Sequence, residues 1–138
     1  MKTIIKIIIA SICFLTNNVD AQITKTVGNS GANFSTLKEA FDSINANLGS
    51  VYTGAITLQL IANTTETASA EINTSNSNWT SINIYPTSSG LSITGNLASP
   101  LININGADNV TFDGRVNASG STIDMTINNT SNNYGKKK

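Results

Sequence analysis

Histidine is absent from the sequence, and Arg115 is its single arginine. Histidine is the side chain used most often for general acid–base catalysis. Glycoside hydrolysis needs two carboxylates on either side of one bond, and no pair in the sequence is placed for that role. We therefore predict no catalytic residue, no cofactor and no metal ligand, and the sequence leans against an enzyme.

Cys13 is the single cysteine, and it lies in an N-terminal segment with the features of a signal peptide. Lys2 and Lys6 precede an apolar run over residues 7–15, and Ala21 ends a cleavage-like sequence. The run is too short to span a bilayer. We expect residues 1–21 to be removed, which gives a secreted protein, extracellular or at the cell surface, with no membrane span and no disulfide.

Charged residues are few, at 12% of the chain. After residue 21 there are seven acidic and six basic side chains, and three of the bases form the terminal run 136–138. So few bases cannot neutralise a run of phosphates, which excludes nucleic acid as a partner. The same deficit argues against a polyanionic polysaccharide.

One segment has the periodicity of an amphipathic helix. Its apolar residues recur at intervals of three and four, and the helix is predicted over residues 35–48. Thr36 with Glu39 matches a capping box, and Gly49 suits a left-handed exit. This helix is expected to bury one stripe against the segments that follow it.

From residue 56 onward the pattern alternates with period two, as in short, half-buried strands. Clusters of Asn, Ser, Thr and Gly separate these segments. The predicted strands cover residues 56–61, 71–74, 81–85, 91–94, 101–105, 110–113 and 122–127.

Two interleaved series of apolar residues share one period. One consists of Ile72, Leu91 and Val110, and the other of Ile82, Ile102 and Ile123. A period of about 20 residues that contains two strands predicts a β-solenoid, in which each strand pairs with its equivalent one coil later. The alternative is an antiparallel β-sandwich, which also uses short alternating strands.

Two stretches resemble a known family. The segment FSTLKEAFDSI (residues 34–44) is similar to the helix that closes the N-terminal end of right-handed parallel β-helices of the pectin-lyase-like kind, found in secreted proteins of Bacteroidetes-type bacteria. The segment LININGADNVTFDG (residues 101–114) resembles their coil consensus. The resemblance implies an all-β fold and, because family members have more coils, further coils or domains of a longer chain.

The predicted organisation is a signal peptide at 1–21, a lead-in at 22–33, a β-helix segment at 34–128 and a polar, basic tail at 129–138. Outward positions of the second series place Asn83, Asn103 and Asp124 in one column, with Tyr85 and Asn105 beside it. Amide and aromatic groups suit hydroxyl-rich ligands, although stacked asparagines also form ladders that satisfy one another.

Two acidic side chains near the C-terminal end are of a type that binds calcium. Asp113 and Asp124 belong to different predicted strand series, so we expect them on different faces and not in a shared calcium site, which needs six to eight converging oxygens.

The sequence thus predicts a secreted scaffold for adhesion or for binding a carbohydrate such as a cell-surface glycan. The alternative is the N-terminal fragment of a polysaccharide lyase, esterase or hydrolase whose catalytic coils are absent.

Overall fold

The computed structural model describes residues 22–47, 50–74 and 78–132. The predicted signal peptide, Gly49 and most of the basic tail lie outside this part of the chain. The elements, in order, are β1 (Ile23–Val27), α1 (Leu37–Ala46), β2 (Thr53–Leu60), β3 (Thr64–Glu66), β4 (Ala70–Asn73), β5 (Asn78–Pro86), β6 (Ser92–Gly95), β7 (Ile102–Asn105), β8 (Val110–Phe112), the 3-10 turn η2 (Val116–Ala118) and β9 (Thr126–Asn129).

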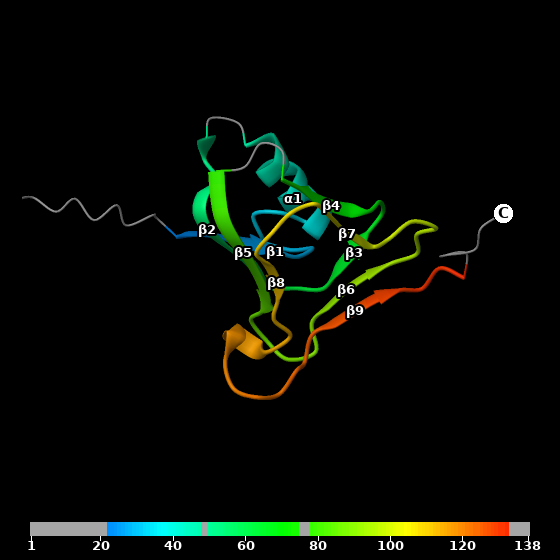
Figure 1. The fold of residues 1–138 in the computed structure, drawn as a ribbon. Coiled ribbons are helices and arrows are strands. Elements are labelled where there is room, and N and C mark those ends of the chain that lie inside the picture. The colour runs from blue at the N-terminus through cyan, green and yellow to red at the C-terminus, as the bar shows by residue number, and fades with distance from the viewer. Residues whose placement is uncertain (1–21, 48–49, 75–77, 133–138) are drawn as a thin grey trace, which may run out of the picture.

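The strands form three sheets, and every pairing between these strands is parallel (Figure 1). Sheet A has the order β1-β2-β5-β8, sheet B the order β3-β6-β9, and sheet C pairs β4 with β7. From β2 onward the chain visits A, B and C in turn and then repeats that order, so each strand pairs with the strand three places later. Parallel pairing contradicts the antiparallel sandwich, which is therefore wrong.

Aliphatic residues at alternate positions make the core between the sheets. Ile56 and Ile82 lie in register in sheet A, and both are fully buried. Leu58 and Ile84 form the next buried pair along the same two strands. The intervening side chains point outward, as expected where alternate residues of a strand face opposite sides.

Both ends of helix α1 are capped, by side chains at its start and by the backbone at its end. The Thr36 hydroxyl accepts a hydrogen bond from the Glu39 backbone N–H at 3.1 Å, and the Glu39 carboxylate accepts one from the Ser35 N–H at 2.8 Å. Asn47 ends the helix in a left-handed conformation with φ 36°. The helix is shorter than the predicted 35–48, because Asn47 already takes the left-handed exit.

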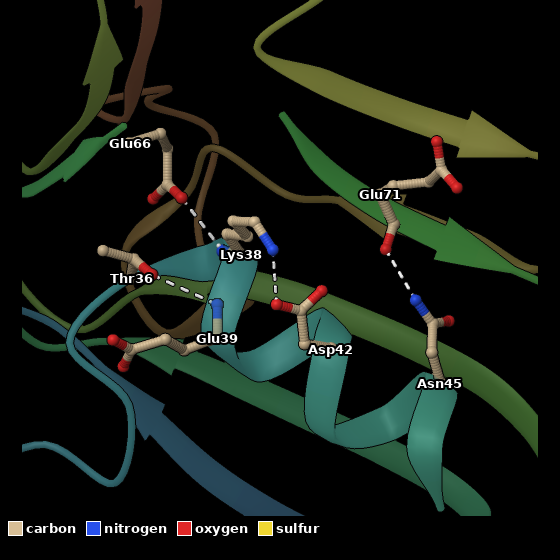
Figure 2. A network of polar contacts seen from close by, with 7 residues as sticks. All are labelled: Thr36, Lys38, Glu39, Asp42, Asn45, Glu66 and Glu71. Carbon is tan, nitrogen blue, oxygen red and sulfur yellow. Dashed lines mark hydrogen bonds and ion pairs between the residues drawn. The ribbon is translucent and has the colours of Figure 1, made fainter. Parts of the chain in front are cut away.

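The buried stripe of α1 is the predicted one: Leu37, Ala40, Phe41 and Ile44 are all inaccessible to solvent. The helix packs against β4 and β3. The Asn45 side chain donates to the Glu71 carbonyl at 2.8 Å (Figure 2). Its side-chain oxygen accepts a hydrogen bond from the Asn73 N–H at 2.9 Å. Asn45 thereby binds the edge of β4 opposite β7, where another strand would otherwise pair.

Glu66 at the end of β3 points into the interior toward the start of α1 (Figure 2). Its side chain is 2% exposed, and its two carboxylate oxygens accept hydrogen bonds from the Leu37 and Lys38 backbone N–H groups, each at 2.9 Å. A helix N-terminus offers unpaired N–H groups and partial positive charge, which a carboxylate satisfies. This contact joins the helix to sheet B.

The predicted repeat of about 20 residues with two strands is wrong, because from β2 onward strands that pair lie three places apart in the chain and are separated by more than 20 residues. In sheet A, Ile56 pairs with Ile82, and Ile82 pairs with Val110. In sheet B, Ile93 pairs with Ile127, which is a longer step again. Ile82 and Ile102 belong to sheets A and C, and Ile123 lies outside the strands.

Three smaller differences follow from the same sheets. The lead-in 22–33 contains β1, which pairs with β2 although the sequence pattern predicts no strand there. Strand β3 is likewise absent from the predicted strands, and the predicted strand 122–127 is displaced to Thr126–Asn129.

Candidate functional site

The five predicted ligand-contact residues do not form one column. Asn83 and Tyr85 lie on β5 in sheet A, whereas Asn103 and Asn105 lie on β7 in sheet C. Asp124 lies between η2 and β9 and belongs to no strand. The structure therefore brings the candidates together as two separate pairs on different faces.

The pair on sheet C is part of a ladder of polar side chains. Asn103 donates its amide to the Glu71 carboxylate at 2.7 Å, and Asn105 donates to the Asn73 side-chain carbonyl at 2.7 Å. These partners lie in register on β4. The ladder interpretation, the alternative to sugar binding, fits this pair because its amides already have partners.

On the outer face of sheet A, one of the predicted contact residues has no side-chain hydrogen bond within the described part of the chain. Asn83 lies there between Thr57 and Thr111, and its side chain makes no hydrogen bond to the described part of the chain. One position further along β5 on this face, Tyr85 lies in register with Gln59, whose amide donates to the Tyr85 hydroxyl at 3.0 Å. A partly exposed aromatic ring beside two amide side chains suits the apolar and hydroxyl surfaces of a sugar.

Asp113 continues this row at the end of the last strand of sheet A. Phe112 lies in register with Ile84, and the Asp113 backbone N–H donates to the Ile84 carbonyl at 2.8 Å. Asp113 is therefore placed opposite Tyr85, on the same outward side. We define the sheet A outer face by Gln59, Asn83, Tyr85 and Asp113.

Arg115 holds the Asp113 carboxylate in a two-pronged ion pair. Arg115 Nη2 lies 2.6 Å from Asp113 Oδ2, and Nε lies 2.9 Å from Oδ1. These hydrogen bonds lower the pKa of Asp113 to about 2, and the same pairing raises the pKa of Arg115. The charges of Asp113 and Arg115 offset each other, so this end of the sheet A outer face carries little net charge.

The loop that carries Arg115 is longer than the other two connections from a sheet A strand to the next sheet B strand. Thirteen residues separate β8 from β9, whereas three separate β2 from β3 and five separate β5 from β6. Its turn η2 packs beside β5 (Figure 1). Asn117 and Ala118 both have φ 52°, a conformation that costs free energy in residues other than glycine. The loop therefore borders the outer face of sheet A.

Asp124 closes the base of this loop through its backbone. Its N–H donates to the Gly114 carbonyl at 2.9 Å. Asp113 and Asp124 thus flank one loop, and the expectation that they occupy two strand series is wrong. No group of three or more potential metal-ligating side chains occurs within residues 22–47, 50–74 and 78–132.

A small pocket lies beside the C-terminal end of α1. It is lined by Ser43, Ala46, Val51 and Tyr52, with a volume of about 220 Å³. The Ser43 and Tyr52 hydroxyls hydrogen-bond to each other at 2.9 Å. Ligand pockets are usually larger, at roughly 300 to 1,000 Å³, so we do not treat this pocket as the site.

Sequence reasoning does not identify Gln59 and Asp113 as members of the sheet A outer face, or Arg115 as the partner of Asp113. Gln59 falls in a predicted strand, but its partnership with Tyr85 depends on the three-strand register. The spacing of the last two predicted strands was a signal for the loop, since the gap between them exceeds each of the four gaps immediately before it.

No helix in the described part of the chain has the length and apolar character needed to cross a membrane. A scan against protein-family models finds none that matches, and searches of curated proteins and of solved structures likewise find no match.

Proposed function

We propose that the chain is a segment of a secreted right-handed parallel β-helix that acts as a scaffold and binds a polysaccharide at the cell surface. The cyclic order of sheets A, B and C and the parallel pairing of each strand with the third one after it support the coiled architecture. Right-handedness is supported by the strong preference of parallel crossover connections for that hand.

The observation that carries the binding proposal is the sheet A outer face. Tyr85 supplies an aromatic ring, and Asn83 and Gln59 supply amides beside it. Sugar rings present both C–H faces and hydroxyl groups, which these side chains match. Since neighbouring strands are about 4.8 Å apart, the row of Gln59, Tyr85 and Asp113 across three strands spans roughly 10 Å, enough for a short run of sugar units.

A neutral glycan fits this face better than an acidic one. Arg115 is the single arginine of the chain, and both prongs of its guanidinium are bound to Asp113. A carboxylated sugar would have to compete with Asp113 for that guanidinium. The ligand class is therefore a neutral, hydroxyl-rich polysaccharide.

A glycan array probed with the purified chain tests this proposal, followed by calorimetry on the glycans retained. Tyr85→Ala and Asn83→Ala are expected to weaken binding by roughly tenfold each, which corresponds to about 1.4 kcal/mol. Asn103→Ala is the matched control, because it truncates an amide on sheet C. Unaltered binding in Tyr85→Ala would remove this face from the proposal, and an array without any retained glycan would refute the function.

A further inference from the structure

Asn105, at the end of β7, is the only asparagine of the sequence that is followed by glycine. Asparagine is a thermolabile residue, because its side-chain carbonyl carbon can be attacked by the backbone nitrogen of the next residue. A β-branched residue in the next position crowds that nitrogen, whereas Gly106 has no Cβ. Asn103 on the same strand is followed by Ile104. The two asparagines of β7 should therefore differ in reactivity.

The turn after β7 leaves Asn105 and Gly106 open to water, since both residues are exposed. Gly106 has a φ of 75°, and its N–H donates to the Ile104 carbonyl at 3.1 Å. That contact lies within the turn itself, so it does not bind the nitrogen to a neighbouring strand. Water therefore reaches both the side chain that is attacked and the nitrogen that attacks it.

The comparable acidic pair, Asp113–Gly114, is held in place by the structure. Aspartate before glycine can close the same ring, but the Asp113 side chain is only 17% exposed. The Arg115 backbone N–H and Nε donate to Asp113 Oδ1, and Nη2 donates to Oδ2. Ile123 packs against Gly114 so closely that a Cβ there would lie 2.5 Å from its Cγ2. Both partners of ring closure are thus restrained, and this pair should not react.

We propose that Asn105 is a site of spontaneous deamidation, a covalent modification of the folded chain that needs only water. The Gly106 nitrogen gives up its proton and bonds to Asn105 Cγ. The Cγ–Nδ2 bond breaks, and ammonia leaves with that proton. Water then opens the cyclic imide at either of its carbonyl carbons, which gives aspartate or isoaspartate. In isoaspartate the chain continues through the side chain.

The modification replaces an attraction in sheet C with a repulsion. Asn105 Nδ2 donates to Asn73 Oδ1 at 2.7 Å and lies 3.5 Å from Glu71 Oε1. A carboxylate at this position has no hydrogen to donate to Asn73, and it repels the Glu71 carboxylate across the strand pair. Isoaspartate also lengthens the backbone just before Gly106, which forms an isolated bridge with Asn73. Deamidation therefore loosens the pairing of β4 with β7 as the molecule ages.

Ageing the purified chain, expressed from the full sequence, in mildly alkaline water enriched in heavy oxygen tests the proposal. Circular dichroism establishes that the chain stays folded, and peptide mapping by mass spectrometry follows each asparagine. We expect Asn105 to lose its amide and take up heavy oxygen, in both aspartate and isoaspartate forms. Asn103 is the internal control, since it belongs to the same ladder, and it is expected to convert roughly tenfold or more slowly. Asp113 is expected to form no isoaspartate.

Three variants test the chemistry and its consequence. Asn105→Gln keeps the amide on a longer side chain and is expected to abolish the conversion at this position. Asn105→Asp carries the product, and its β7 amides are expected to exchange hydrogen faster than those of wild type. The double variant Asn105→Asp/Glu71→Gln is expected to restore much of the protection, because the repulsion is removed. If Asn105→Asp does not fold, the aged wild-type chain gives the same exchange readout.

The results that would overturn the proposal are specific. An amide retained at Asn105 after ageing, conversion at Asn103 as fast as at Asn105, or faster isoaspartate formation at Asp113 would each refute the assignment of the site. Exchange of the β7 amides at the wild-type rate in Asn105→Asp would refute the loosening of sheet C.

Discussion

Replacing Glu66 with glutamine should destabilise the fold far more than a change of one atom type suggests. The carboxylate of Glu66 is buried and receives two backbone N–H groups from the start of α1. Glutamine keeps one acceptor oxygen and turns an NH₂ group toward the second N–H. One hydrogen bond is lost, a buried donor is left unpaired, and the favourable interaction of a negative charge with the helix N-terminus disappears.

A lower bound on the magnitude follows from the lost hydrogen bond and the lost interaction with the helix dipole. A hydrogen bond to a charged group contributes about 1.5 to 3 kcal/mol, and the helix dipole adds about 0.3 to 1 kcal/mol. We therefore expect Glu66→Gln to lower the free energy of unfolding by about 2 to 4 kcal/mol, a large share of the roughly 5 to 15 kcal/mol typical of a domain. At about 4 °C per kcal/mol, the melting temperature should fall by roughly 8 to 16 °C.

Urea unfolding followed by circular dichroism measures this loss. Glu39→Gln is the control, because Glu39 lies in the first turn of the same helix but is exposed, and its loss should be about 0.5 kcal/mol. Hydrogen exchange adds a local readout, since the Leu37 and Lys38 amides should exchange faster in Glu66→Gln alone. If Glu66→Gln is as stable as Glu39→Gln, the carboxylate does not join the helix to sheet B as argued.

Two further changes test the remaining contacts. Asn45→Ala removes both hydrogen bonds to the edge of β4 and should cost about 1 to 3 kcal/mol, with faster exchange of the Asn73 amide; protection of that amide equal to wild type would contradict the capping role. Asp113→Asn tests the ion pair with Arg115: because folding lowers the pKa of Asp113 from 3.8 to about 2, its contribution is present above pH 4 and is lost as pH falls toward 2. The stability difference between wild type and Asp113→Asn should shrink over that interval, and a difference independent of pH would refute the coupling.

The helix and most strands could be predicted because their signals are local. Leu37, Phe41 and Ile44 recur at helical spacing, and the alternation in segments such as Ile82–Tyr85 depends only on neighbouring residues. Strand β3 could not be found this way. Its inward residues are Thr64 and Glu66, and a buried glutamate becomes intelligible only once the start of α1 is placed beside it.

The prediction of which strands pair failed for a different physical reason. Strands follow one another at short intervals here, and each has the same alternation and similar Asn and Gly corners. Spacings of two strands and of three strands therefore give similar apolar matches along the sequence. Ile82 matches Ile102 two strands on as well as it matches Val110 three strands on, and closure of three sheets around one core decides between them.

This error also misplaced the candidate site. Pairing between strands two places apart would put Asn83 and Asn103 in one column, whereas the observed pairing between strands three places apart puts them on sheets A and C. The wrong repeat length is also the reason why the pairing of Tyr85 with Gln59 was not predicted. Side-chain type could nominate residues for sugar contact, but their grouping required the three-dimensional register.

The cover that α1 provides at one end gives the chain a direction of growth. Ribosomes deliver residues from the N-terminus, so the helix, β3 and β4 are available before any of β7, β8 or β9 has been made. Each later strand then meets a partner strand that was made three strands earlier, and it need not wait for a partner further along the chain. If each strand pairs as it is made, a growing chain exposes few unpaired strand edges to its neighbours.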